Sequence, residues 1–169
     1  LAGIPFFAEQ RRKEEPFVIG GGPCTCNPEP VADFFDALVV GDGEAVILQM
    51  TDAWKDWRRS DSDKRDALLD RWSQIKGVYI PSFFDVSIDA GGTQRLLPKK
   101  SSHQDVERAV VSDLNDEPSP STPIIPFGKP VHDRLRMEIA RGCTRGCRFC
   151  QAGMIYRPVR ERHPEAVLS

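Results

Sequence analysis

The chain has 169 residues, a formal net charge of -2 at pH 7 and 40% hydrophobic residues. This length allows one ordinary domain or two partial ones, and the near-neutral charge argues neither for nor against a nucleic-acid partner. Because no apolar run approaches the roughly eighteen residues that a membrane span requires, we expect no membrane partner.

The cysteines indicate the compartment. Five cysteines lie in two tight clusters, Cys24 with Cys26 and Cys143 with Cys147 and Cys150. An odd number of cysteines in tight clusters suits metal binding in a reducing compartment better than a disulfide framework. We therefore expect a cytoplasmic protein. Cys24 and Cys26 could ligate a second site, although small buried or loop thiols are the commoner meaning of such a pair.

In chain order, the first half alternates strands, glycine turns and helices. Residues 17–19 form a short β-branched run that enters a glycine turn, and 28–30 can open a short helix. A second strand is expected over 37–40, followed by another glycine turn and a helix over about 45–57. A further helix carries apolar residues on one face over 67–75. This rhythm predicts an α/β fold with a parallel sheet.

From residue 77 onward, the sequence pattern no longer alternates strands, glycine turns and helices. Apolar and polar residues alternate over 84–88, a glycine turn follows, and 106–114 could form a further strand, so we expect a small antiparallel connector. Prolines between 118 and 130 predict a stiff, extended linker. A last strand is expected over 134–140, carrying Leu135, Met137 and Ile139 in alternation. We therefore divide the chain into domains 1–76, 77–130 and 131–169.

The three cysteines after that strand carry the chemistry. A Cys-x3-Cys-x2-Cys loop supplies three soft ligands, one fewer than a closed four-cysteine iron-sulfur or zinc site, so one metal position stays open for chemistry. Structural zinc is the alternative, with His132 or His163 as the fourth ligand.

Residues 129–165 hold nine Lys or Arg against four Asp or Glu. This segment could steer an anionic cofactor or RNA, but a solvated basic face is its commoner meaning.

The run 138–160, Glu-Ile-Ala-Arg-Gly-Cys-Thr-Arg-Gly-Cys-Arg-Phe-Cys-Gln-Ala-Gly-Met-Ile-Tyr-Arg-Pro-Val-Arg, together with 18–23 and 39–44, resembles bacterial radical S-adenosylmethionine (radical SAM) proteins with an N-terminal cobalamin-binding-type domain. The resemblance implies that 1–76 are the C-terminal part of a Rossmann-like domain. It also implies that 131–169 begin a partial (β/α) barrel. Since the chain starts at Leu1 and a helix has only begun at its other end, we expect an internal fragment that is inactive by itself.

The resemblance also implies the site. Cys143, Cys147 and Cys150 would bind three irons of a 4Fe-4S cluster, and the fourth iron would bind S-adenosylmethionine, with Phe149 beside the nucleoside. Reductive cleavage would yield a 5′-deoxyadenosyl radical that acts on an unknown substrate. The electron donor would be a flavodoxin or a ferredoxin. A methylthiotransferase that acts on RNA or protein, and a zinc-stabilised binding module without catalysis, are the alternatives.

The glycine turns carry a second implied cofactor. By the same resemblance Gly20, Gly21, Gly22, Gly41 and Gly43 would face a cobalamin or its evolutionary remnant, because glycine lets the backbone approach a bulky ligand at the carboxyl edge of a parallel sheet. Tight turns without a ligand explain the same glycines equally well. The Asp-x-His-x-x-Gly motif that ligates cobalt in many cobalamin domains does not occur in the sequence.

Overall fold

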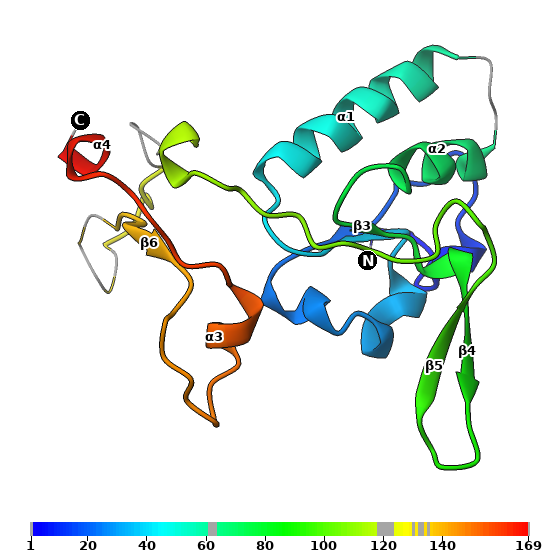
Figure 1. The fold of residues 1–169 in the computed structure, drawn as a ribbon. Helices are drawn as coiled ribbons and strands as arrows, with labels where there is room; N and C mark the ends of the chain where they lie inside the picture. Colours follow the sequence, from blue (N-terminus) through cyan, green and yellow to red (C-terminus); the bar gives the residue numbers. More distant parts are fainter. Residues whose placement is uncertain are drawn as a thin grey trace. The chain divides into compact units, whose positions relative to one another are not determined.

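The computed structural model describes residues 2–60, 64–117, 124–129, 131, 134 and 136–168. The chain divides into two compact units, Leu1–Val110 and Val111–Ser169. Figure 1 follows it through both. Within the described part, no helix is both long enough and apolar enough to cross a bilayer.

A three-stranded sheet in the order β1, β2, β3 forms the centre of the first unit. Its strands are β1 (Ile19–Gly20), β2 (Ala37–Val39) and β3 (Val78–Tyr79). β1 and β2 are parallel, whereas β3 runs antiparallel to β2. The mixed α/β class is confirmed, and β1 and β2 are parallel as predicted. The predicted Rossmann-like parallel sheet is not confirmed, because β3 is antiparallel to β2.

Two helices, rather than one, connect β2 to β3. α1 (Glu44–Arg59) leads away from the end of β2, and α2 (Arg65–Trp72) leads back beside it (Figure 1). A single crossover helix returns the chain to the start of the preceding strand, so the next strand is parallel. A second helix brings the chain back to the other end. The third strand therefore enters the sheet in the opposite direction.

Both predicted helices are present. Val46, Met50 and Trp57 are the buried residues of α1, and their spacing places them on one helical face. α1 is slightly longer than the predicted range 45–57, and α2 ends at Trp72, somewhat earlier than predicted. The apolar pattern thus located both helices and left their ends uncertain, as expected for a signal that depends on buried positions.

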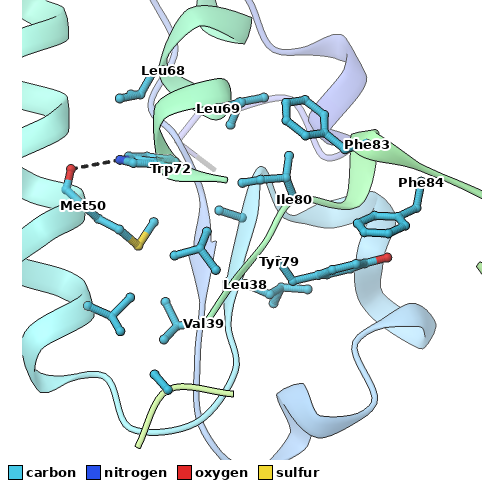
Figure 2. Close-up of a cluster of buried hydrophobic side chains, with 14 of the residues drawn as sticks. Leu38, Val39, Met50, Leu68, Leu69, Trp72, Tyr79, Ile80, Phe83 and Phe84 are labelled. Carbon is cyan, nitrogen blue, oxygen red and sulfur yellow. Dashed lines mark hydrogen bonds between the residues drawn. The ribbon is translucent and has the colours of Figure 1, made fainter. Parts of the chain in front are cut away.

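The core of the first unit combines the helices and the sheet (Figure 2). Trp72 donates a hydrogen bond from its indole Nε1 to the backbone oxygen of Met50 at 2.9 Å, which ties α2 to α1 inside the core. Leu38 of β2 and Ile80, just after β3, are fully buried in the same cluster. Residues 78–84 therefore contribute to this core, although the sequence placed them in a connector.

A β-hairpin follows the core, as the alternating pattern predicts. Its strands β4 (Phe84–Ile88) and β5 (Gln94–Pro98) pair antiparallel. The Asp89 carboxylate accepts hydrogen bonds from two backbone N–H groups of the turn, both at 2.9 Å. The further strand predicted over 106–114 is wrong, since Ala109 forms only an isolated parallel bridge there.

Short 3₁₀ helices complete the fold: η1 (Ala8–Gln10), η2 (Pro23–Cys26), η3 (Glu29–Phe34), η4 (Pro81–Phe83) and η5 (Leu114–Asp116). η3 lies where the prolines at 28 and 30 predicted a short helix. Glu29 accepts a hydrogen bond from the Tyr79 hydroxyl, which fixes η3 to β3. Burial, and then the Glu29 carboxylate, raise the pKa of Tyr79 above its ordinary value.

The second unit is built from short elements. These are β6 (Ala140–Arg141), β7 (Arg160–Glu161), α3 (Ala152–Ile155) and α4 (Pro164–Leu168). β6 and β7 pair antiparallel. The strand predicted over 134–140 is wrong for its described residues before Ala140, and Leu135 lies outside the described residues. A barrel would begin with parallel strands, so the predicted barrel start is not confirmed.

The two compact units divide the chain between Val110 and Val111. The predicted domains end instead at residues 76 and 130, and as domain boundaries these stay a prediction. Most of the proline-rich stretch falls on 118–123 and 130, which lie outside the described residues.

His103 makes the stability of the first unit depend on pH. It is 4% exposed, its ring lies against Phe83 and Phe84, and its Nε2 has no hydrogen-bond partner among the described residues. Burial, with a smaller contribution from Lys100, holds the pKa of His103 below its ordinary value, although a hydrogen bond from the ring to the backbone carbonyl oxygen of Ser73 opposes this shift. The folded state therefore favours the neutral ring.

Because folded His103 favours the neutral ring, the folded protein loses stability at acidic pH. Because the unfolded chain binds the proton more readily, this contribution to stability is present above about pH 6.5 and is lost as the pH falls through the folded-state pKa. We expect the urea midpoint of the wild type to fall more than that of His103→Gln between about pH 7.5 and about pH 5. Equal decreases in the two proteins would contradict this assignment.

Candidate metal centre

The cysteine loop lies between the two paired strands of the second unit. β6 ends at Arg141, the loop and α3 follow, and β7 closes the segment. Gly142 starts the loop with a φ of +99°, and a Cβ at this position would lie 2.6 Å from the backbone oxygen of Tyr156. Only glycine satisfies both constraints. The loop therefore follows a strand end, as predicted, and its entry is fixed by close backbone contact.

The loop backbone forms a turn around the last two cysteines. The N–H of Cys150 donates to the carbonyl oxygen of Cys147 at 3.1 Å. The backbone N–H of Arg145 points at the Cys143 sulfur, with a nitrogen to sulfur distance of 3.4 Å. Backbone N–H groups near cysteine sulfur stabilise negative charge there and help set the potential of a bound iron-sulfur centre.

Two of the three predicted ligands share one surface hollow, which we call the cysteine hollow. Its volume is about 500 Å³, and its lining residues are Arg145, Gly146, Cys147, Arg148, Phe149, Cys150, Gln151, Gly153, Met154 and Arg157. Cys143 lines a second hollow with Thr144, Pro158 and Val159, and Arg157 lines both. Across the described residues, no three His, Cys, Asp or Glu side chains are gathered closely enough to hold one ion.

The donor chemistry nevertheless fits a cluster. Cys143, Cys147 and Cys150 are all free thiols, and the last two are exposed. Phe149 lines the cysteine hollow with 92% of its surface exposed, so this ring is accessible to a ligand. Three accessible thiols on one loop can bind three irons and leave the fourth iron of a cube open.

Of the two histidines in the zinc alternative, the structure describes His163. His163 is exposed, and its backbone N–H donates to the Asn115 side-chain oxygen at 2.8 Å. It belongs to no group of three potential metal ligands in the described part of the chain. His132 lies outside the described residues.

The predicted cobalamin glycines fall into two groups. A Cβ at Gly20 would lie 2.4 Å from Leu38 Cδ2, and one at Gly41 would lie 2.1 Å from the Ala109 carbonyl oxygen. The protein's own packing therefore requires glycine at these two positions. Gly21, Gly22 and Gly43 have open space where a Cβ would stand. A cobalamin contact at these three stays a prediction.

Substitution separates the two groups. Gly41 has a φ of +103°, so we expect Gly41→Ala to destabilise the protein by at least about 1–3 kcal/mol from backbone conformation alone. Gly43 precedes α1 with a φ of -94°, and Gly43→Ala should cost less, about 0.5–1 kcal/mol, because alanine is a poorer N-cap residue than glycine. Urea unfolding measures both. Equal effects would contradict the packing role of Gly41.

Cys24 and Cys26 are exposed free thiols in the first unit. Both lie in η2, and the buried Thr25 between them donates from its hydroxyl to the backbone oxygen of Val39 at 2.7 Å. The turn is therefore anchored by Thr25 while both thiols face solvent. This arrangement agrees with loop thiols rather than small buried ones.

Sequence reasoning missed the roles of the arginines near the cysteine loop. Arg145, Arg148 and Arg157 line the cysteine hollow, while Arg160 is buried and donates to the backbone oxygen of Val111 at 2.6 Å. The only signal in the sequence was the excess of basic residues over 129–165. That excess does not distinguish an arginine that supports the backbone from one that faces a ligand.

Comparison with known proteins points in the same direction. Residues 1–81 match a family model described as radical SAM proteins, N-terminal. An uncharacterized protein of Methanocaldococcus jannaschii is 30% identical over 156 residues, which cover 89% of this chain and 27% of that relative. The chain thus spans about a quarter of the length of the curated relative it matches. No solved structure matches. The family match supports a radical SAM protein.

Proposed function

We propose that this chain is part of a radical S-adenosylmethionine enzyme whose 4Fe-4S cluster is held by Cys143, Cys147 and Cys150. The main evidence for this proposal is the combination of two features that lie far apart in the chain. A radical SAM N-terminal match covers residues 1–81, and a loop with three free thiols at Cys-x3-Cys-x2-Cys spacing begins after β6. Because the two features lie in different parts of the chain and are independent of each other, together they support the proposal more strongly than either one does alone.

The residues of the loop have distinct tasks in this proposal. When bound, the cluster supplies the electron that cleaves S-adenosylmethionine to methionine and a 5′-deoxyadenosyl radical. The thiolates of Cys143, Cys147 and Cys150 would hold the metal and would leave one iron for the amino and carboxylate groups of the cosubstrate. The ring of Phe149, which is exposed, would pack beside the nucleoside. Gly142 fixes where the loop leaves β6, and the Arg145 N–H stabilises charge on the Cys143 sulfur.

The cluster requires Cys143 to move toward the other two thiols. Cys147 and Cys150 line one hollow and Cys143 lines another. Residues 144–150 are exposed, so few buried contacts oppose a rearrangement of the loop. Metal binding frequently orders its own ligands, because the free energy of binding offsets the ordering of the loop.

Anaerobic analysis of the full-length protein tests the proposal. After reconstitution we expect about four irons and four sulfides per chain, and formation of 5′-deoxyadenosine and methionine when dithionite is the reductant. One zinc with no iron or sulfide would replace the proposal with the zinc-stabilised module. A cluster whose four irons are all ligated by side chains would also contradict it, since no iron would be left for the cosubstrate.

A methylthiotransferase would pass the same analysis, so its product must be examined. That reaction adds sulfur and a methyl group to RNA or protein, whereas a radical SAM enzyme without a sulfur donor yields no thiomethylated product. Mass spectrometry of substrate pools after turnover distinguishes the two. A thiomethylated product would establish the methylthiotransferase alternative within the same superfamily.

A further inference from the structure

The hairpin of the first unit has outer edges with no strand partner in the described chain. β4 and β5 form a two-stranded sheet that extends beyond the three-stranded one (Figure 1). At one end of the hairpin, the Lys99 N–H donates to the Phe83 carbonyl oxygen at 2.8 Å. At the other end, the Asp89 N–H donates to the Thr93 carbonyl oxygen at 3.0 Å. Because bonded and outward-pointing residues alternate in an antiparallel pair, the even-numbered residues of β4 point their backbone groups outward.

The outer edge of β4 therefore presents backbone groups to a further strand. Val86 and Ile88 each offer an N–H and a carbonyl oxygen there. Phe84 offers its carbonyl oxygen, since its N–H already donates to that of Pro81. Unpaired groups along a strand edge are a template for another strand, and a sheet of two strands gains stability from a third. This edge can thus accept an extended backbone.

The same strand borders a cavity of about 560 Å³, which we call the hairpin cavity. Phe84 and Val86 line it, and Val86 is 52% exposed. Their register partners on β5, Pro98 and Leu96, do not line it. Side chains of a strand alternate between its two faces. A strand added beside β4 therefore places every second side chain over the hairpin cavity.

The hairpin cavity has carboxylates without a cation. Glu9, Asp33 and Asp66 line it and are exposed. Among the described residues, none of these three side chains has an ion-pair or hydrogen-bond partner. Like charges in a concave surface reinforce one another and attract the opposite charge. The hairpin cavity therefore favours a ligand that carries positive charge.

The cations that line the hairpin cavity do not neutralise these carboxylates, because each of them already has another partner. Arg11 and Arg65 both bind the buried Asp36 carboxylate at 2.7 Å. Lys99 pairs with Asp85 at 2.9 Å. The negative charge at the hairpin cavity is therefore left for a molecule outside the described chain.

We propose that the outer edge of β4 and the hairpin cavity bind an extended, basic segment of a partner protein as an added β-strand. Backbone groups that repeat at every second residue match another extended backbone, and adjoining pockets select alternate side chains. A lysine or arginine of the segment lays its aliphatic stem along Phe84 and Val86 and brings its charge to the carboxylates. The inference goes beyond the proposed function and does not depend on the cluster.

The composition of β4 favours a different protein over a second copy of this chain. Residues 84–88 are Phe-Asp-Val-Ser-Ile, without a lysine or an arginine. Two β4 strands paired with each other would bring no cation to the carboxylates of the hairpin cavity. A segment with lysine or arginine at alternate positions brings one for each pair of residues and so complements both the backbone edge and the charge.

Peptide binding to the full-length protein tests the inference. The probe is a fluorescein-labelled peptide, Thr-Lys-Thr-Val-Thr-Lys-Thr, and its affinity is measured by fluorescence anisotropy at low and at high salt. Val86→Pro removes an outward N–H of β4. Leu96→Pro is the matched control, because Leu96 lies opposite Val86 in the register and its N–H points to the outer edge of β5. Proline is tolerated where the N–H of an edge strand faces solvent.

The wild type should bind the lysine peptide, and Val86→Pro should bind it about tenfold or more weakly, because the added strand loses a backbone bond and meets the proline ring. Binding by Leu96→Pro should stay within about twofold of the wild type. Replacing both peptide lysines with glutamate should weaken binding to the wild type by about tenfold or more at low salt. High salt should narrow that difference, because it screens exposed charges.

A charge exchange tests the same inference without changing the hairpin. Asp33→Lys/Asp66→Lys should bind the glutamate peptide more tightly than the lysine peptide, which reverses the order of the wild type. Asp52→Lys is the control, since Asp52 is an exposed residue of α1 that does not line the hairpin cavity. This control should keep the wild-type order.

Several results would overturn the inference. The wild type would fail to bind the lysine peptide, the two proline variants would lose equal affinity, or the charge exchange would leave the order of the two peptides unchanged. If the wild type sedimented as a dimer that Val86→Pro dissociates, and the lysine peptide did not bind, a second copy would occupy the edge instead. None of these results bears on iron content or on 5′-deoxyadenosine formation, so the proposed function is tested separately.

Discussion

Replacing Asp36 with alanine is expected to lower the free energy of unfolding by about 3–5 kcal/mol, the usual cost of removing one partner from a buried ion pair. The Asp36 side chain is 4% exposed, and its two oxygens accept from Arg11 and Arg65, both at 2.7 Å. The backbone N–H of Val18 donates to the same carboxylate at 2.8 Å. The substitution leaves two guanidinium groups and one N–H without this acceptor.

The network is important because it holds distant parts of the chain together. Arg11 also donates to the backbone oxygen of Phe34 at 2.8 Å, and Arg65 donates to that of Glu15 at 2.7 Å. The Arg65 guanidinium lies 3.7 Å from the centre of the Phe17 ring. Asp36 therefore attaches the segment that precedes β1 to η3 and α2. Its loss should release that segment together with the buried charges.

An exposed carboxylate provides the control for Asp36. Asp52 pairs with Lys55 at 3.0 Å on α1, but both side chains are largely exposed. Asp52→Ala should change the free energy of unfolding by about 0–1 kcal/mol. Urea unfolding at neutral pH compares the two variants with the wild type. Similar small losses in both would show that solvent or rearrangement compensates the two arginines, which contradicts the structural role of Asp36.

The Asp36 network illustrates what the sequence could not predict. Arg11, Asp36 and Arg65 are far apart in the chain, and each is an ordinary charged residue in its local context. α1 and β2 were predictable because their buried residues recur at the helical spacing or form a short apolar run. Ion pairs carry no such local period. Which charged residues form ion pairs depends on how the chain folds in three dimensions. Arg65, for example, reaches Asp36 from α2. The antiparallel direction of β3 depends on the same return of the chain through α2.

The candidate site was predictable to a similar extent. The cysteine loop stands out in the sequence because its three thiols fall within eight residues. The strand before it was overpredicted, since alternation over 134–140 looks like a strand whether or not a partner pairs with it. Among the described residues from 134 to 141, only Ala140 and Arg141 pair with β7. Some arginines of the second unit line the cysteine hollow, and others, such as Arg160, support the backbone. This difference depends on three-dimensional contacts, so composition could not reveal it.

Replacing Cys147 with alanine is expected to abolish the cluster in the full-length protein. The proposed site provides only three thiolates for four irons, so the loss of one thiolate leaves two irons without protein ligands. Iron and sulfide should fall by about tenfold or more after anaerobic reconstitution, and formation of 5′-deoxyadenosine should fall to background. The backbone hydrogen bond from Cys150 to residue 147 does not involve the thiol. The turn should therefore persist, and circular dichroism should show an unchanged fold.

The double variant Cys24→Ala/Cys26→Ala is the matched control for Cys147. It removes two exposed free thiols of the first unit, in η2. If the cluster belongs to the cysteine loop alone, the double variant should keep wild-type iron, sulfide and dithionite-driven cleavage, while Cys143→Ala and Cys150→Ala should behave like Cys147→Ala. Iron lost equally from the double variant would mean that η2 supplies ligands. No iron would then be left for S-adenosylmethionine if η2 completed a four-thiolate site, and the proposed chemistry would have no open position.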